Sequence, residues 1–210
     1  SNFDVARWLY VGCGPTSAGV GGVGFLISPR CRQSFVESEV CEEARIVRLK
    51  FTVFDVVGVY APTRKDLSIQ DEFFTKVSAL VRTLRSDRYF ILGDFNSDVF
   101  RASSRQSTFA DILQSLSLRT VQSIAQRQNW TWTSSSNNAS RTLDYICIPS
   151  RYASSVRRVR FLTPIVPSDH RMVIADIKFR WRVLHREEHA QLSSLPISHS
   201  WHLLASPSIR

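Results

Sequence analysis

The chain has 210 residues and a mass of 23.9 kDa, which suits one domain with a buried core. Apolar residues make up 43% and charged residues 21%, which excludes a wholly disordered chain, a collagen and a coiled coil. The net charge is +9. The sequence contains no run of about 18 apolar residues, the length that a membrane-spanning helix needs.

The charge excess is carried by arginine, since 23 of the 27 basic residues are arginines. The guanidinium is a planar fork that matches phosphate oxygens, so an arginine-rich soluble domain is a candidate for binding nucleic acid. A basic protein with no such partner is the alternative that charge alone leaves open. The four cysteines include no CxxC pair, so we expect free thiols rather than a zinc site or a disulfide scaffold.

The first half of the chain predicts strands followed by a helix. Glycines lead into an apolar strand over 20–27, and a turn is expected over 29–34. Valine-rich runs over 44–51 and 54–60 predict a hairpin. Apolar residues at i, i+3 and i+4 spacing predict an amphipathic helix over 67–88. A short buried strand over 89–92 ends at Gly93.

The second half alternates the two element types. We expect a second amphipathic helix over 108–118, a short strand over 130–133 and a polar loop over 134–140. Further strands are predicted over 143–148, 156–162 and 171–179. Beyond Trp181 the pattern decays into a segment rich in Ser, His and Pro, which we interpret as a linker or tail. Interleaved strands, hairpins and helices predict an α/β fold in which helices cover a mixed sheet.

Polar side chains that could carry chemistry lie at the ends of the predicted strands. Strand edges are rigid, and loops on a rigid scaffold often carry function. Each such residue alone is more simply a turn former, a helix cap or a half-buried strand end. The candidates are Tyr60, Asp94, Asn96, Asp144, Asp169 and His170.

Taken together, these residue types are the parts of metal-assisted phosphodiester hydrolysis. A cation of the magnesium type prefers carboxylate oxygens and acts as a Lewis acid on a phosphoryl oxygen. A carboxylate next to a histidine sets the tautomer and charge of the imidazole. Amide and phenol groups can donate hydrogen bonds to phosphate or leaving-group oxygens. We therefore expect a phosphodiesterase site at these strand ends.

Five short motifs surround the candidate residues. They are, in chain order, Val59-Tyr60-Ala61-Pro62, Ile91-Leu92-Gly93-Asp94-Phe95-Asn96, Thr131-Trp132-Thr133, Leu143-Asp144-Tyr145-Ile146 and Ser168-Asp169-His170. Their order and spacing resemble the endonuclease/exonuclease/phosphatase superfamily. Within it, they most resemble the apurinic/apyrimidinic-like endonuclease domain of non-LTR (LINE-type) retrotransposons. The resemblance covers residues 19–179 and implies a layered sandwich of two mixed β-sheets flanked by helices.

The resemblance assigns a role to each candidate at the centre of the site. Asp94 would orient or deprotonate the attacking water, and Asn96 would hold the phosphate and Asp94 in place. His170 would contact a non-bridging phosphate oxygen, and Asp144 would orient His170 through a hydrogen bond. Mechanisms proposed for the family differ in the protonation roles of Asp94 and His170, and both stay open here. Asp169 would belong to the metal site.

Further residues are assigned around this centre. Tyr60 would contact the phosphate or the leaving oxygen. Trp132, Thr133 and Ser168 would support the site, and packing alone is the simpler role for Trp132 and Thr133. Arg141 could reach the phosphate backbone of a nucleic acid, although a solvated arginine explains its position equally well.

One part of the family pattern is absent from the front of this chain. Family members carry an Asn and then a metal-binding Glu ahead of the glycine-rich strand. Residues 1–10 contain no Glu, and Asp4 does not lie in a matching context. The resemblance therefore predicts a domain over 1–180 that is incomplete at its N-terminus and binds metal weakly. A linker or tail over 181–210 would follow it.

These features predict a Mg²⁺- or Mn²⁺-dependent endonuclease that nicks DNA to a 3′-hydroxyl, as in target-primed retrotransposition. The resemblance implies a nuclear protein, monomeric and without membrane association, that is fused to a reverse transcriptase in its parent polypeptide. One alternative is another phosphoesterase of the superfamily, of the inositol phosphatase, sphingomyelinase or deadenylase type. That branch usually carries an Asp-Arg pair where this chain has Asp144 and Tyr145. The other alternative is an inactive remnant that only binds nucleic acid.

Overall fold

The computed structural model describes residues 7–17, 19, 21–63, 67–84, 86–101, 108–126, 129–163, 167–179 and 199–205. Its centre is a six-stranded sheet in the order β3-β4-β5-β6-β10-β7. The strands are β3 (Phe35–Cys41), β4 (Ile46–Phe51), β5 (Asp55–Tyr60), β6 (Tyr89–Asp94), β7 (Leu118–Thr120) and β10 (Asp144–Pro149). The sheet is mixed, because β5 and β6 are parallel whereas the other neighbours are antiparallel.

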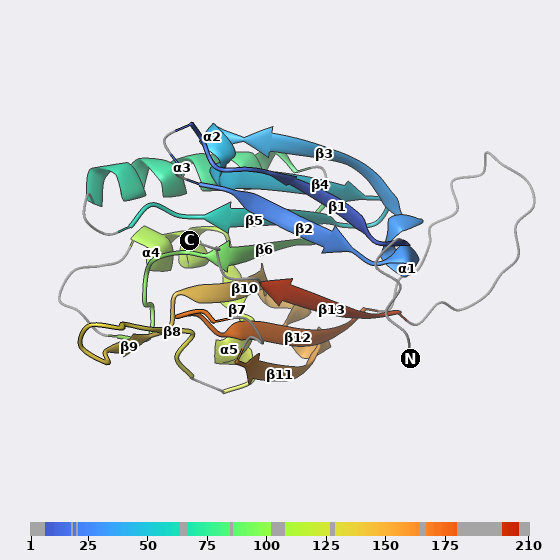
Figure 1. The fold of residues 1–210 in the computed structure, drawn as a ribbon. Coiled ribbons are helices and arrows are strands. Elements are labelled where there is room, and N and C mark those ends of the chain that lie inside the picture. The colour runs from blue at the N-terminus through green and yellow to red at the C-terminus, as the bar shows by residue number, and fades with distance from the viewer. Residues whose placement is uncertain are drawn as a thin grey trace, which may run out of the picture.

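Two helices cover one face of this sheet, α3 (Leu67–Thr83) and α4 (Thr108–Ser115) (Figure 1). Their apolar residues, among them Phe74 and Phe109, form one core with Val59 and Tyr145 of the sheet. The shorter helices lie at strand ends: α1 (Pro29–Arg32), α2 (Glu42–Arg45), α5 (Val121–Ile124) and the 3₁₀ helix η2 (Ser150–Ser155).

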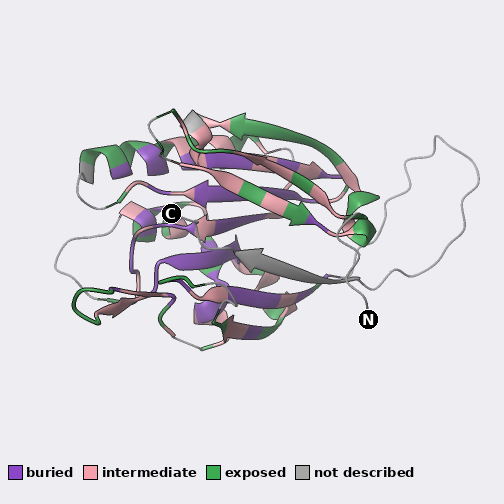
Figure 2. Ribbon diagram, viewed as in Figure 1, coloured by how far each residue is buried: buried purple, intermediate pink, exposed green. Residues whose placement is uncertain are grey.

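A second layer of strands covers the other face. It contains the antiparallel pair β1 (Leu9–Cys13) and β2 (Val23–Ile27) and the sheet β11 (Val156–Leu162), β12 (Met172–Phe179) and β13 (His199–Ala205). The pair β1–β2 contacts β3, β4 and β5, whereas β13 contacts β6 and β10. Figure 2 shows buried residues along the central strands of the large sheet and along β12 of the second layer.

The layered sandwich that the sequence predicted is confirmed. Strand β10 is apolar after Asp144 because both of its faces are buried. Ile146 and Ile148 belong to the core between the strand layers, while Tyr145 and Cys147 belong to the core under the helices. A strand buried on both faces has no polar side to alternate with. In this structure the second layer consists of two separately hydrogen-bonded sheets.

Several elements differ from their predicted bounds. A short helix, α1, replaces the predicted turn, and α3 ends at Thr83. Helix α4 ends at Ser115, and Leu118 begins strand β7. Strands β1 and β3 were not predicted. Strand β3 is an edge strand whose residues 36–40 are all exposed, so its sequence lacks the apolar face that marks a strand.

Part of the segment predicted as a linker or tail forms a strand. Residues 199–205 are β13, which pairs antiparallel with β12 along its whole length, from Val173↔Ala205 to Phe179↔His199. Backbone pairing of this kind needs no apolar side-chain pattern, which is why a Ser- and His-rich stretch gave no signal. The remaining residues of 181–210 lie outside the described residues.

All four cysteines are free thiols, as predicted, and only Cys147 is fully buried. None of the helices that the structure describes is long and apolar enough to cross a membrane.

Candidate active site

Two carboxylates face each other across neighbouring strands at the centre of the large sheet. Asp94 is the last residue of β6, Asp144 is the first residue of β10, and the antiparallel register places them directly opposite each other. Both side chains are buried. Like charges opposite each other destabilise a sheet, and burial adds the cost of desolvation. Such an arrangement is typical of a functional site.

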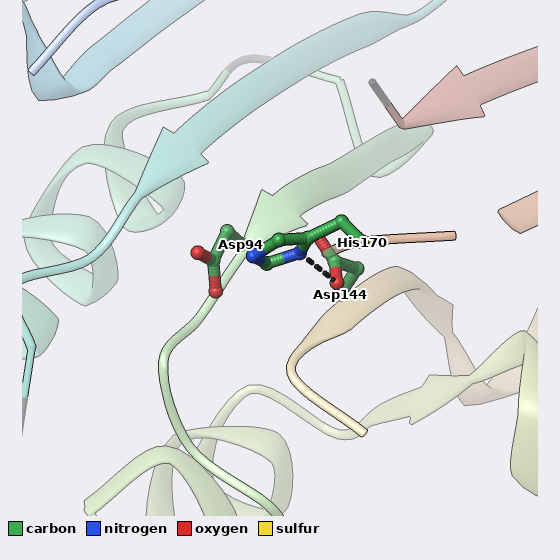
Figure 3. A group of neighbouring side chains, drawn as sticks. All are labelled: Asp94, Asp144 and His170. Atoms are coloured by element: carbon green, nitrogen blue, oxygen red, sulfur yellow. Dashed lines mark hydrogen bonds and ion pairs between the residues drawn. The ribbon is translucent and has the colours of Figure 1, made fainter. Parts of the chain in front are cut away.

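His170 completes the cluster, and its imidazole lies between the two carboxylates (Figure 3). Its Nδ1 is 2.8 Å from Oδ2 of Asp144. Because an ionised carboxylate only accepts hydrogen bonds, the histidine donates here from Nδ1, which leaves Nε2 for other partners. The position of His170 comes from the loop before β12, where it forms an isolated β-bridge with Trp132. The predicted contact between Asp144 and His170 is therefore present in the structure.

The charges in this cluster shift its protonation equilibria. Burial and the nearby Asp144 raise the pKa of Asp94 to about 7, against the opposing effects of the His170 charge and the Asn96 N–H. Burial lowers the pKa of His170, but the hydrogen bond to Asp144 and the charges of Asp144, Asp94 and Asp169 outweigh it, so the net shift is upward. The site thus holds a carboxylate that titrates near neutral pH beside an imidazole that favours its cationic form.

Asn96 holds the Asp94 carboxylate from the other side. Its backbone N–H donates to Oδ1 of Asp94 at 2.8 Å, and its Nδ2 lies 3.3 Å from Oδ2 of Asp94. The same Nδ2 donates to the carbonyl of Ala61 at 2.8 Å. Asn96 has a φ of 46°, a left-handed conformation that asparagine tolerates better than most residues. The amide therefore ties the end of β6 to the end of β5.

The two carboxylates of this cluster fit a divalent cation. One ligand atom from each of Asp94, Asp144 and His170 lies within 4.8 Å of the others. Asp169 is exposed at the rim, where its Oδ2 accepts a hydrogen bond from Nε1 of Trp132 at 2.9 Å. A cation would offset both the burial and the repulsion that raise the pKa of Asp94, and carboxylate oxygens are the ligands that hard cations prefer.

Tyr60 lies at the same edge of the sheet, because the parallel β5–β6 register pairs it with Asp94. An arginine holds it there: the guanidinium of Arg45 lies 5.3 Å from the centre of the Tyr60 ring, and Nη1 donates to the Tyr60 carbonyl at 3.1 Å. The sequence alone did not indicate Arg45, because it is 15 residues from Tyr60 in a different element.

Two buried polar residues position Asp144 and were not predicted for this role. The Thr131 hydroxyl accepts hydrogen bonds from the N–H groups of Leu143 and Asp144, at 2.9 and 3.0 Å. Nε2 of Gln122 donates to the Asp144 carbonyl at 2.9 Å. Thr131 belongs to the motif Thr131-Trp132-Thr133, whereas Gln122 lies in a stretch that contains none of the five motifs.

The remaining predicted residues lie around the loop that carries His170. Ser168 accepts the His170 N–H at 3.1 Å, and the Thr133 N–H donates to the Asp169 carbonyl at 2.9 Å. Trp132 and Thr133 form β8 (Trp132–Thr133), which pairs with β9 (Ser140–Arg141). Arg141 is half-buried on β9 and, among the described residues, pairs with no carboxylate.

Three solved structures with a similar fold are described as nucleic-acid enzymes. A 3′ phosphatase, NExo, from Neisseria, bound to product DNA hairpin, matches with a TM-score of 0.69 and 19% identity over 83% of this chain and 80% of that one. An AP endonuclease from Archaeoglobus fulgidus matches with a TM-score of 0.65 and 15% identity, over 82% and 80%. The endonuclease domain of TRAS1, a telomere-specific non-LTR retrotransposon, matches with a TM-score of 0.59 and 11% identity, over 81% and 78%.

At these identities the likeness shows the fold alone. No curated protein sequence matches the chain significantly. The sequence pattern of one family does match, over residues 3–170, which include every residue of the buried cluster. The predicted superfamily is thereby confirmed: this chain belongs to the endonuclease/exonuclease/phosphatase family.

Proposed function

We propose that this protein is a Mg²⁺-dependent endonuclease that hydrolyses phosphodiester bonds in DNA and leaves a 3′-hydroxyl. The observation that carries this proposal is the buried cluster of Asp94, Asp144 and His170 at one edge of the sheet. Family membership limits the chemistry to phosphoester hydrolysis, and the cluster supplies groups suited to it.

The residues of the cluster have complementary tasks. Asp94, with a pKa of about 7, would accept a proton from water as the water oxygen attacks phosphorus. His170, kept cationic by Asp144, would donate from Nε2 to a phosphate oxygen and stabilise the charge that develops there. The bond from phosphorus to the 3′-oxygen breaks, and that oxygen takes up a proton from solvent, which leaves a 3′-hydroxyl and a 5′-phosphate. Asn96 would keep Asp94 aligned, and Tyr60 would contact the phosphate or the leaving oxygen.

We propose Asp169 as a ligand of a Mg²⁺ or Mn²⁺ ion beside the cluster, in which carboxylate oxygens of Asp94 and Asp144 lie within 4.8 Å of each other. When bound, it would supply Lewis-acid stabilisation of the phosphoryl and leaving oxygens. Asp169 is suited to this position because it is exposed, follows Ser168 directly and has its carboxylate oriented by Trp132.

DNA as the substrate is supported by the net charge of +9 and its arginine content. The fold likeness to enzymes described as a 3′ phosphatase bound to DNA and as an AP endonuclease supports it further. We also propose that the protein acts as a nuclear monomer and belongs to a retrotransposon polypeptide with a reverse transcriptase. The likeness to the TRAS1 endonuclease domain supports this last point.

Nicking of supercoiled plasmid tests the proposal. The protein should convert supercoiled plasmid to the open circle with Mg²⁺ and stop doing so with EDTA. The nicked product should be a substrate for DNA polymerase extension, since extension requires a 3′-hydroxyl. Asp94→Ala and His170→Ala should each lower the nicking rate by at least about a hundredfold. Asp111→Asn, an exposed carboxylate of α4, is the matched control and should nick normally.

Other outcomes distinguish the alternatives. Nicking by Asp94→Ala or His170→Ala at the normal rate would refute the residue assignment. Turnover of an inositol phosphate or of a 3′-phosphate in place of plasmid would favour another phosphoesterase of the family. DNA binding without any metal-dependent hydrolysis would identify an inactive remnant.

A further inference from the structure

An exposed indole and a guanidinium are stacked on each other beside the catalytic cluster. Cζ of Arg171 lies 4.4 Å from the centre of the Trp130 ring. Trp130 nevertheless remains 41% exposed, which makes it one of the few large apolar side chains at the surface of the described residues. The exposed part of the indole is an aromatic surface on which a nucleic-acid base could stack, two residues from Trp132, which bridges to His170.

The pair is fixed to the catalytic loop by backbone contacts. Arg171 directly follows His170, and its N–H donates to the carbonyl of Thr131 at 2.7 Å. Thr131 directly follows Trp130, and Trp132 forms the β-bridge with His170. The stacked pair is therefore held by backbone contacts to the loop that carries His170.

Arg171 has hydrogen-bonding capacity that the protein does not use. Its Nη1 donates to Oδ1 of Asn129 at 3.3 Å, and its Nε is buried without a partner in the described part of the chain, so only the outer nitrogens of the guanidinium can reach a ligand. No carboxylate of the described residues forms an ion pair with it. Its charge is thus available to an anion, and a guanidinium binds phosphate oxygens in a fork geometry.

We propose that Trp130 and Arg171 form a nucleotide subsite for the DNA strand next to the bond that is cleaved. The indole stacks on a base and the guanidinium binds the phosphate of that nucleotide. Every base has a face that can stack on an aromatic ring, but in a paired duplex both faces are covered. The subsite therefore favours an unpaired base at this position. This proposal rests on the proposed function, which supplies the DNA substrate.

The test measures DNA binding without cleavage. Fluorescence anisotropy in EDTA gives the affinity for a labelled single-stranded oligonucleotide and for its duplex. Trp130→Ala should weaken single-strand binding about five- to a hundredfold and duplex binding less, because only the single strand offers a free base face. Trp130→Phe should keep most of the affinity, since a phenyl ring still stacks.

Arg171 is tested through the salt dependence of the same binding. Loss of one phosphate contact should reduce the slope of log affinity against log salt by about 0.7 for a single strand. Arg171→Gln should show this reduction, whereas Arg171→Lys should retain the slope because it retains the charge. Tyr10→Ala and Arg157→Gln are the matched controls, since both residues are exposed on other strands, β1 and β11.

Equal single-strand affinities of the wild type and a folded Trp130→Ala would overturn the subsite. Equal losses for Trp130→Phe and Trp130→Ala would overturn the stacking role. The proposed function fails separately: a protein that binds DNA through Trp130 but never nicks plasmid refutes the nuclease and leaves the subsite intact. A protein that nicks plasmid and binds equally well without the indole refutes only the subsite.

Discussion

Asp94 carries a buried carboxyl group directly opposite a second buried carboxylate, that of Asp144. The fold imposes this arrangement, because the register of β6 and β10 aligns the two residues. His170 relieves part of the repulsion by lying between them, and Asn96 relieves part by donating to Asp94. Burial, together with the repulsion that remains, raises the pKa of Asp94 to about 7.

This shift predicts how stability depends on pH without metal. Between the unfolded pKa of about 4 and the folded value of about 7, folded Asp94 retains a proton that the unfolded chain has lost. The free energy of unfolding should therefore fall as pH rises through this range, by about 4 kcal/mol. The raised pKa of His170 acts in the same direction, because its contribution is lost as pH rises through the folded value.

Urea denaturation in EDTA at several pH values between 4 and 8 measures this effect, because Asp94 titrates within this range. Asp94→Asn should lose most of the pH dependence, since the amide does not titrate. Asp111→Asn, the exposed control, should follow the wild type. An Asp94→Asn protein with an unchanged pH dependence would show that Asp94 does not carry the shift.

At the scale of elements, the site depends on how closely β5 and β6 approach each other. Gly93, the residue before Asp94, has a φ of 141°, which L side chains rarely adopt. A Cβ at this position would lie 1.9 Å from the Val59 carbonyl oxygen. The glycine thus lets the end of β6 stay paired with β5 while it presents Asp94 beside Tyr60.

Gly93→Ala should therefore destabilise the protein by about 3 kcal/mol or more, through backbone strain and the clash with β5. Gly14→Ala is the control, because a Cβ there would meet nothing within 4 Å and should change stability by less than about 0.5 kcal/mol. Thermal and urea unfolding measure both variants. Equal stability of the two would mean that β6 can shift to accept the methyl group.

At the scale of the whole molecule, the domain boundary depends on β13. The sequence predicts a domain that ends at 180. Strand β13 (His199–Ala205), however, pairs with β12 along its length. Without β13, one edge of strand β12 would be unpaired, and the layer would lose the strand that contacts β6 and β10. Exposed edges of this kind promote aggregation.

Two truncated chains test this boundary. A chain that ends at Ala205 keeps β13, whereas a chain that ends at Arg180 loses it. We expect the shorter chain to unfold at a temperature lower by several degrees, roughly 2–8 °C for each kcal/mol lost, and to aggregate at lower concentration. Melting curves and light scattering measure the difference. Equal melting temperatures would show that the domain is complete at 180 and that the rest is a tail.

Much of the fold could be predicted from the sequence, and the physical reason is side-chain periodicity. Helix α3 and strands β4, β5 and β10 are long or apolar enough for their pattern to be unambiguous. Strand β3, with its exposed residues, and strand β13 depend on backbone pairing with a neighbour. No local pattern reports such pairing, because the partner lies elsewhere in the chain.

The family, the layered architecture and the residues of the buried cluster could be predicted from the sequence, because short motifs retain their order along the chain. Only the tertiary structure showed that the Asp94 carboxyl titrates near neutral pH, that Thr131, Gln122 and Arg45 position the site, and that Trp130 stacks on Arg171. Each of these depends on burial or on a distance between residues far apart in the chain. Folding creates both, and no stretch of sequence contains either.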